Sequence, residues 1–202
     1  MSKVLALITM SLDGYITGPN DGPGSGLGVG GERLHNWVFG GPWRYDSAER
    51  GHMDPDDQAW FDAKSAPMGA VIGGRGTYEA AEHWGDRNPW QVPFFIVTHR
   101  PEEEPSGHGF TFVGSIADAA ERARAAAGQK TVHVMGGADI IREFLGAGLV
   151  DELTIVIAPL ILGDGKRLFD GFTRSIELEQ LGAHQSRFAT FIDYRIKQNA
   201  AG

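Results

Sequence analysis

The chain has 202 residues, of which 42% are hydrophobic and 22% charged, with a formal net charge of -8 at pH 7. This length and apolar content suit one compact domain rather than a disordered chain. The acidic balance disfavours nucleic acid as a partner, because such binding depends on Lys and Arg side chains that neutralise phosphates. The chain has no cysteine, which excludes disulfides and thiolate chemistry, and no spacing of histidines or acids predicts a metal site.

The chain begins with an apolar run at residues 3–10 that ends shortly before Asp13-Gly14. Such a run predicts a strand that is buried on both faces of a sheet. It is too short to cross a membrane and lacks the cleavage site of a secretory signal. We therefore expect a cytoplasmic protein that has no membrane partner.

Residues 19–53 are rich in glycine and interrupt the pattern of elements. Long loops of this kind in compact domains are usually functional or disordered, and the aromatic residues here argue against plain disorder. We interpret the segment as a lid-like insertion. Its aromatic side chains, including Trp37 and Phe39, would suit a wall that stacks on a planar substrate; a hydrophobic flap or a dimer contact is the alternative.

Strands and helices alternate after the insertion. The predicted helices begin at residue 54, after residue 73, and span 116–127 and 138–146; the predicted strands span 70–73, 94–98, 110–113, 131–135, 152–162, 176–184 and 187–197. Alternation of this kind predicts a largely parallel sheet flanked by helices, and the last two strands predict an antiparallel C-terminal edge hairpin. The expected organisation is a single α/β domain over residues 1–198.

A glycine pair joins the strand at 131–135 to the next helix, in the sequence VMGGADIIREFL. Glycines allow a backbone to approach a pyrophosphate closely, and a helix N-terminus offers unpaired N–H groups to an anion. A tight strand–helix turn without a ligand is the alternative, since a lone Gly-Gly is a weak signal.

Two other strands end in residues that suit phosphate. VIGGRGTYE carries Arg75 and Thr77 after its glycines, and VTHRP places His99 and Arg100 at the end of the next strand. Each alone is compatible with a solvated loop. Because ligands of open α/β sheets bind at the carboxyl ends of the strands, the three motifs together favour a dinucleotide that carries a 2′-phosphate. The three spaced glycines of the usual Rossmann fingerprint are absent after the first strand.

These motifs, together with SLDGYITG and DELTIVIAPLILGDGKRLF, resemble the dihydrofolate reductase superfamily. The greatest similarity is to the reductase domain of the bifunctional deaminase/reductase of riboflavin biosynthesis and its stand-alone relatives. The resemblance covers the chain apart from the insertion. It implies a dihydrofolate-reductase-like mixed sheet, NADPH as the cofactor, a homodimer and an activity such as 5-amino-6-(5-phosphoribosylamino)uracil reductase.

The resemblance also assigns residues to the cofactor. The residues that it places around NADPH are Ile8, Thr9 and Ile16 near the nicotinamide, Gly74, Arg75 and Thr77 at the phosphates, Thr98, His99 and Arg100 at the adenosine and its 2′-phosphate, and Gly136, Gly137, Ala138, Asp139 and Ile140 at the pyrophosphate and ribose. Ala138 departs from dihydrofolate reductase, which has a third glycine there.

The helix that begins DPDDQAWFDAK resembles the helix that carries the substrate-binding acid of dihydrofolate reductase, and Asp57 falls on the position of that acid. A buried acid there could bind an N–C–N edge and promote protonation, so Asp57 is the candidate catalytic residue. A helix cap is the alternative role. Trp60 and Phe61 follow it as candidate substrate contacts, with Trp37 and Phe39.

We therefore expect an NADPH-dependent reductase of a small planar heterocycle, such as a pterin or pyrimidine. Three alternatives remain open from the sequence: dihydrofolate reductase proper, a reductase that uses flavin or deazaflavin, and a non-catalytic dinucleotide-binding protein. The region of the 152–162 strand is a candidate surface for a homodimer.

Overall fold

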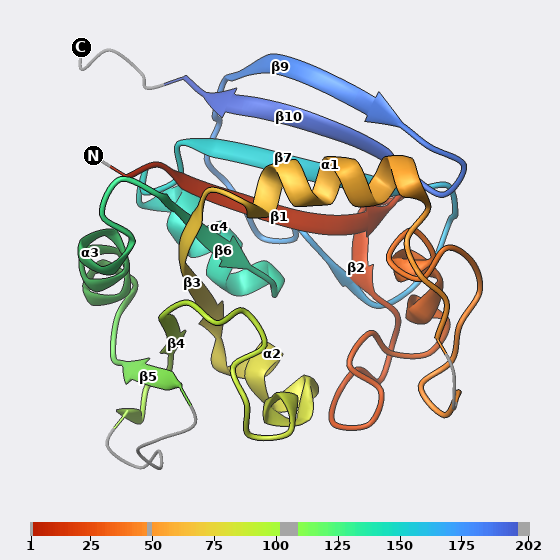
Figure 1. The fold of residues 1–202 in the computed structure, drawn as a ribbon, viewed down its shortest axis with the longest axis horizontal. Helices are drawn as coiled ribbons and strands as arrows, with labels where there is room; N and C mark the ends of the chain where they lie inside the picture. The colour runs from red at the N-terminus through yellow and green to blue at the C-terminus, as the bar shows by residue number, and fades with distance from the viewer. Residues whose placement is uncertain (1, 48–49, 102–108, 198–202) are drawn as a thin grey trace.

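The computed structural model describes residues 2–47, 50–101 and 109–197 (Figure 1). An eight-stranded sheet forms its centre, in the order β5-β4-β3-β6-β1-β7-β10-β9. The strands are β1 (Val4–Ser11), β3 (Met68–Gly74), β4 (Phe94–Val97), β5 (Phe110–Val113), β6 (Thr131–Met135), β7 (Glu152–Ala158), β9 (Leu178–Gln185) and β10 (Thr190–Ile196).

The first six strands of this order run parallel to one another. The strand β10 runs antiparallel to β7, and β9 runs antiparallel to β10. The structure therefore confirms the predicted mixed sheet with a C-terminal edge hairpin. The hairpin turn is longer than expected: it spans residues 186–189, and Ser186 and Ala189 are joined by a backbone hydrogen bond of 2.9 Å.

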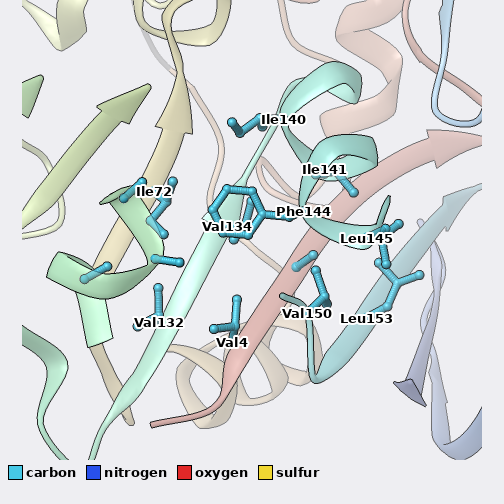
Figure 2. Packing of buried hydrophobic residues seen from close by; sticks show 14 of the residues in the cluster. Val4, Ile72, Val132, Val134, Ile140, Ile141, Phe144, Leu145, Val150 and Leu153 are labelled. Atoms are coloured by element: carbon cyan, nitrogen blue, oxygen red, sulfur yellow. The ribbon is translucent and has the colours of Figure 1, made fainter. Parts of the chain in front are cut away.

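Two helices cover one face of the sheet, α3 (Ile116–Ala127) and α4 (Ala138–Gly146). Alternate strand residues such as Val4, Ile72 and Val134 point toward this layer and pack around Phe144 of α4 (Figure 2). Ser115 caps α3 by accepting a hydrogen bond from the Asp118 amide, at 3.2 Å. Within the described parts of the chain, no helix has both the length and the apolar content needed to cross a bilayer.

The opposite face is covered by α1 (Pro55–Ser65), by α2 (Arg75–Ala80) with the 3₁₀ turn η2 (Glu82–Trp84), and by the insertion (Figure 1). The insertion is not featureless: it contains the 3₁₀ turn η1 (Gly31–His35), and both Leu34 and Trp37 are buried. It docks through an aromatic cluster, which we define as Trp37 of the insertion, Trp60 and Phe61 of α1, and Phe191 of β10.

Two further details differ from the sequence-based expectation. A second, small sheet pairs β2 (Tyr15–Thr17) with β8 (Lys166–Arg167), and neither strand was predicted. The strand β7 ends at Ala158 instead of residue 162. Pro159 follows directly, and proline fixes φ and lacks the N–H that a central strand would donate.

The carboxyl ends of β1 and β7 are fastened together by Asp13. Its carboxylate accepts hydrogen bonds from the Leu162 and Gly163 amides, at 3.0 and 2.9 Å, and from Ser11 Oγ at 2.6 Å. The bond from Ser11, followed by the two amide bonds, lowers the pKa of Asp13 to about 2. Asp13 therefore fixes the loop after β7 against the loop after β1.

Candidate functional site

The glycine pair that follows β6 lies beside the start of α2. A Cβ atom built on Gly136 or on Gly137 would lie 3.7 Å from Thr77 Oγ1 in either case. The peptide bond between the two glycines is cis. Gly137, the N-cap of α4, has no side chain and therefore gives no capping bond to the first N–H groups of this helix. The structure thus brings together Thr77 and the helix terminus that the sequence assigned to a pyrophosphate.

The three residues that open α4 differ in what they can offer. Ala138 and Ile140 have buried side chains that pack into the core between the sheet and the helices α3 and α4. Only their backbone is therefore available beside the glycine pair. Asp139 is exposed and forms an ion pair with Arg142 of the next turn. The same guanidinium donates to the Leu168 carbonyl, at 3.3 Å, which ties α4 to the segment after β8.

Arg75 joins α2 to the end of β4. Its Nε donates to Glu79 Oε1 at 2.7 Å, and its Nη1 donates to Thr98 Oγ1 at 3.3 Å. Thr98 Oγ1 also accepts from the Arg100 amide at 3.3 Å. His99 and Arg100 are exposed next to this junction. The helix predicted after residue 73 is α2, which begins at Arg75 and carries Arg75 and Thr77 in its first turn.

The predicted nicotinamide contacts occupy two sides of β1. Ile8 Cδ1 lies 3.7 Å from the Cβ position of Gly136, on the side of α3 and α4. Thr9 points to the other face, because successive strand residues alternate, and its Oγ1 accepts from Trp37 Nε1 at 3.1 Å. Ile16 of β2 is buried in the same core as Ile8. We define the glycine edge as the strand ends that carry Arg75, Thr77, Thr98 and the Gly136-Gly137 pair. The end of β1 therefore separates the glycine edge from the aromatic cluster.

Asp57 is fully buried in the first turn of α1, with no exposed surface. Asp54 caps this helix by accepting from the Asp56 amide at 3.1 Å, so the capping role belongs to Asp54. The Oδ2 atom of Asp57 accepts from Ser186 Oγ at 3.0 Å, and its Oδ1 atom lies 3.6 Å from His184 Nε2. Burial raises the pKa of Asp57, while the bond from Ser186 and the nearby His184 oppose that rise.

The predicted substrate contacts are divided between two places. Trp37 is 3% exposed and packs edge-on against Trp60 and Phe191, with ring centroids 6.1 and 5.2 Å apart. Phe61 lies 6.1 Å from Trp37 in the same cluster. Phe39 instead packs against Trp43, at 4.6 Å. Trp37, Trp60 and Phe61 thus form one group close to the helix that carries Asp57, and Phe39 belongs to a second group within the insertion.

Ser186 and His184 are the site residues that sequence reasoning missed. Both lie in the C-terminal hairpin, and Ser186 is 129 residues beyond Asp57 in the sequence. The predicted turn at residues 185–186 was the available signal, because a turn serine next to an edge strand can reach a neighbouring element. Nothing in the local sequence links that turn to α1.

Two hollows lie away from these residues. One, of about 140 Å³, is a mainly apolar groove between Leu145 of α4 and Phe172. The other, of about 270 Å³, lies within the insertion between Glu32 and Tyr45. Neither is lined by a residue that the sequence assigned to the site.

The chain is similar in sequence to known proteins. A sequence model of the RibD C-terminal domain matches residues 2–187. The uncharacterized protein YwjB of Bacillus subtilis (strain 168) is 28% identical over 125 residues, which cover 61% of this chain and 71% of YwjB. The uncharacterized protein YyaP of the same organism is 40% identical over 52 residues, which cover 26% of this chain and 28% of YyaP.

Solved structures share the fold. A protein of Shewanella sp. PV-4 assigned to riboflavin biosynthesis superposes with a TM-score of 0.70 at 22% identity, covering 97% of this chain and 99% of that one. A pyrimidine reductase-like protein of Corynebacterium diphtheriae gives 0.62 at 14% identity, covering 98% and 93%. Dihydrofolate reductase of Enterococcus faecalis, complexed with NADP(H), gives 0.59 at 17% identity, covering 97% of each chain.

The predicted superfamily is thereby confirmed, and the match supports the prediction of an oxidoreductase. Since the family model spans residues 2–187, the chain belongs to the RibD C-terminal domain family and has a dihydrofolate-reductase-like fold.

Proposed function

We propose that this protein is an NADPH-dependent reductase that transfers a hydride to a small planar heterocycle. The observation that carries the proposal is the convergence of three strand ends at one edge of the sheet. There the Gly136-Gly137 pair, Thr77 and the Arg75–Thr98 junction lie side by side, in a chain of the RibD C-terminal domain family. Ligands of open α/β sheets bind at such an edge.

The residues present fit a dinucleotide phosphate. The two glycines place no side chain of their own on the approach to α4, and a Cβ on either would lie 3.7 Å from Thr77 Oγ1. The N-terminus of α4 favours an anion through its N–H groups and its dipole. Arg75 and His99 supply donors for a second phosphate, the one that distinguishes NADPH from NADH.

The bound nicotinamide would supply the hydride, and the protein must supply a proton and hold the acceptor. Asp57 is the proton donor in this proposal, because it is a carboxyl group whose pKa is raised by burial. Its helix also carries aromatic rings that would stack on a planar molecule. Because Asp57 has no exposed surface, some of the surrounding side chains must move before substrate can reach it. Trp37, which comes from the insertion, is the side chain we expect to move.

For the substrate we favour a pyrimidine of the riboflavin pathway type, 5-amino-6-(5-phosphoribosylamino)uracil, with pterins and dihydrofolate next. Support comes from the family match and from the names of two structural neighbours, one assigned to riboflavin biosynthesis and one pyrimidine reductase-like. We also propose a homodimer. Because β7 is hydrogen-bonded on both sides, such a dimer would use side chains near its end, where Leu12 and Ile161 are exposed.

Calorimetric titration with NADPH, and with NADH in parallel, tests the cofactor. We expect NADPH to bind more tightly, and NADPH oxidation to follow when the correct heterocycle is added. Binding of neither nucleotide would contradict the proposal and direct the search to flavin or deazaflavin.

A non-catalytic dinucleotide-binding protein is the second candidate, and the closed aromatic cluster favours it. Trp37 bonds to Thr9 and packs against Trp60 of the helix that carries Asp57. If the protein keeps this closed arrangement in solution, NADPH binds, but none of the candidate heterocycles named above is reduced. Trp37 fluorescence would then stay unchanged on addition of each candidate substrate.

A further inference from the structure

We propose that the C-terminal hairpin controls the proton on Asp57: Ser186 fixes one carboxylate oxygen, and His184 exchanges a proton with the other. This inference rests on the proposed role of Asp57 as the proton donor. In it Ser186 and His184 are positioning residues, which act on the substrate only through Asp57.

One oxygen of the Asp57 carboxyl group is held by a serine whose own orientation is fixed. The turn that closes the hairpin directs Ser186 at Asp57: Ser186 Oγ accepts from the Phe188 and Ala189 amides, at 3.2 and 3.3 Å. These two bonds leave its single proton for Asp57 Oδ2, at 3.0 Å. The serine therefore fixes the orientation of the carboxyl group and leaves Oδ1 as the atom available for proton exchange.

Oδ1 faces the imidazole. Asp57 Oδ1 and His184 Nε2 lie 3.6 Å apart, both are buried, and neither has a hydrogen-bond partner in the described part of the chain. Two unsatisfied buried polar atoms are costly, and a small rotation of the imidazole would pair them with each other. The His184 ring is held beside Phe191, with centroids 5.3 Å apart, so it already lies next to Asp57.

Access to solvent distinguishes the two side chains. Asp57 is 0% exposed, whereas 31% of the His184 side chain is exposed. A carboxyl group that gives up a proton inside the protein must recover it through a neighbour. His184 is suited to this because an imidazole can accept a proton at one nitrogen while it releases one from the other.

Three other charged groups, at the cap of α1, on the hairpin turn and along α1, do not offer such a route. Asp54, on the same helix, is an acid that disfavours the ionised form of Asp57. Arg187 of the turn lies over the Phe188 ring, at 5.4 Å. Further along α1, Lys64 is engaged with Asp193 of β10, at 2.7 Å.

The proton balance is simple. Asp57 releases one proton to the substrate and becomes a carboxylate. His184 then gives its Nε2 proton to Oδ1 while a hydronium ion of the solvent delivers a proton to Nδ1. A flip of the imidazole ring returns the N–H group to the side of Oδ1 before the next turnover, so that one solvent proton reaches the substrate in each cycle. No oxidant or reductant takes part in this exchange.

The first test needs no cofactor and therefore stands apart from the test of the proposed function. The protein is labelled with ¹³C at the Asp carboxyl groups and ¹⁵N in the histidines, and is titrated by NMR; Asp57→Asn identifies the carboxyl signal. We expect the His184 signals to respond over the pH range in which Asp57 titrates, and this response to vanish in Asp57→Asn. We also expect Ser186→Ala to move the Asp57 midpoint upward, because the bond that favours the carboxylate is lost. His184 signals that are identical in wild type and Asp57→Asn would overturn the proposal.

The second test uses turnover once a substrate is found. His184→Ala should lower kcat by about 10-fold or more at alkaline pH and less at acid pH, where solvent protons are abundant. Free imidazole added to the buffer should restore part of the loss. His52→Ala, which removes an exposed histidine of the insertion, is the control and should behave as wild type. An equal loss at every pH that imidazole does not relieve would show a merely structural role and overturn the proposal.

Discussion

The glycine edge and the acid site lie on the same fold but are built in opposite ways. At the glycine edge, the contributing residues lie just beyond the ends of β3, β4 and β6, and His99, Arg100 and Asp139 remain exposed. At the acid site, α1 and the C-terminal hairpin hold a carboxyl group that has no exposed surface, and the insertion packs on the same two elements through the aromatic cluster.

The difference shows that phosphate binding and proton donation need different surroundings. A charged phosphate can be held at an open edge, since helix N–H groups and guanidinium groups remain effective partners for it there. A proton donor benefits from enclosure, because burial raises the pKa of a carboxyl group toward neutral pH. The variants below test whether the two regions are in fact separate in function.

Asp57→Asn should produce the largest effect. Loss of a general acid lowers turnover by about 10²- to 10⁴-fold, whereas NADPH affinity should stay unchanged because the glycine edge is untouched. Steady-state kinetics and calorimetry on the same variant measure the two quantities. A parallel loss of NADPH affinity would mean that the regions are coupled.

The same variant has a signature in stability. Because the pKa of Asp57 is raised in the folded protein, the folded state binds more protons than the unfolded state between the ordinary value of 3.8 and the raised value. Wild-type stability should therefore fall as pH rises through that interval. Asp57→Asn should lack this decline, as measured by urea unfolding at several pH values.

Trp37→Ala should come next, as a test of whether the acid site is closed in solution. Truncation of a buried aromatic residue costs about 3–5 kcal/mol, and Trp37 also loses its bond to Thr9. Phe39→Ala, at a half-buried position of the same insertion, is the matched control and should cost less. A loss below about 1 kcal/mol for Trp37→Ala would show that the insertion is mostly undocked in solution.

Arg75→Ala addresses the glycine edge alone. A charge-assisted hydrogen bond to phosphate is worth about 1.5–3 kcal/mol, so NADPH should bind about 10- to 100-fold more weakly while NADH binding changes little. Arg122→Ala, which breaks an exposed pair on α3, serves as the control. Equal weakening of the two nucleotides would remove Arg75 from the 2′-phosphate site.

Asp13→Asn should give the smallest effect, a loss of stability that disappears at acid pH. The pKa of Asp13 is lowered to about 2 in the folded protein, so its stabilising contribution is present above 3.8 and is lost as pH falls toward 2. Thermal unfolding of wild type and variant should therefore converge between pH 4 and pH 2. A constant difference over that range would assign the effect to the hydrogen bonds rather than to the charge.

The glycine edge was predictable because its signals are local. Gly136-Gly137, Arg75 and Thr98 each follow a short apolar run, and parallel strands bring their carboxyl ends together without further information. The small sheet of β2 and β8 was missed because strands of three and two residues are too short to show a period.

The acid site was predictable only in part. The position of Asp57 came from the resemblance of its helix, but its partners depend on how the hairpin lies against α1. The aromatic residues of the insertion indicated packing without indicating the side, and the structure separates Trp37 from Phe39. Contacts of this kind are set by tertiary structure, which a local pattern does not encode.

The bond between Asp57 and Ser186 also bears on protein synthesis. The acid is made early and its serine partner 129 residues later. A ribosome-bound chain that has completed the glycine edge up to α4 therefore still lacks the hairpin that orients the carboxyl group. Nucleotide binding and proton donation should consequently appear at different times during translation, and the last strands to emerge decide when the second begins.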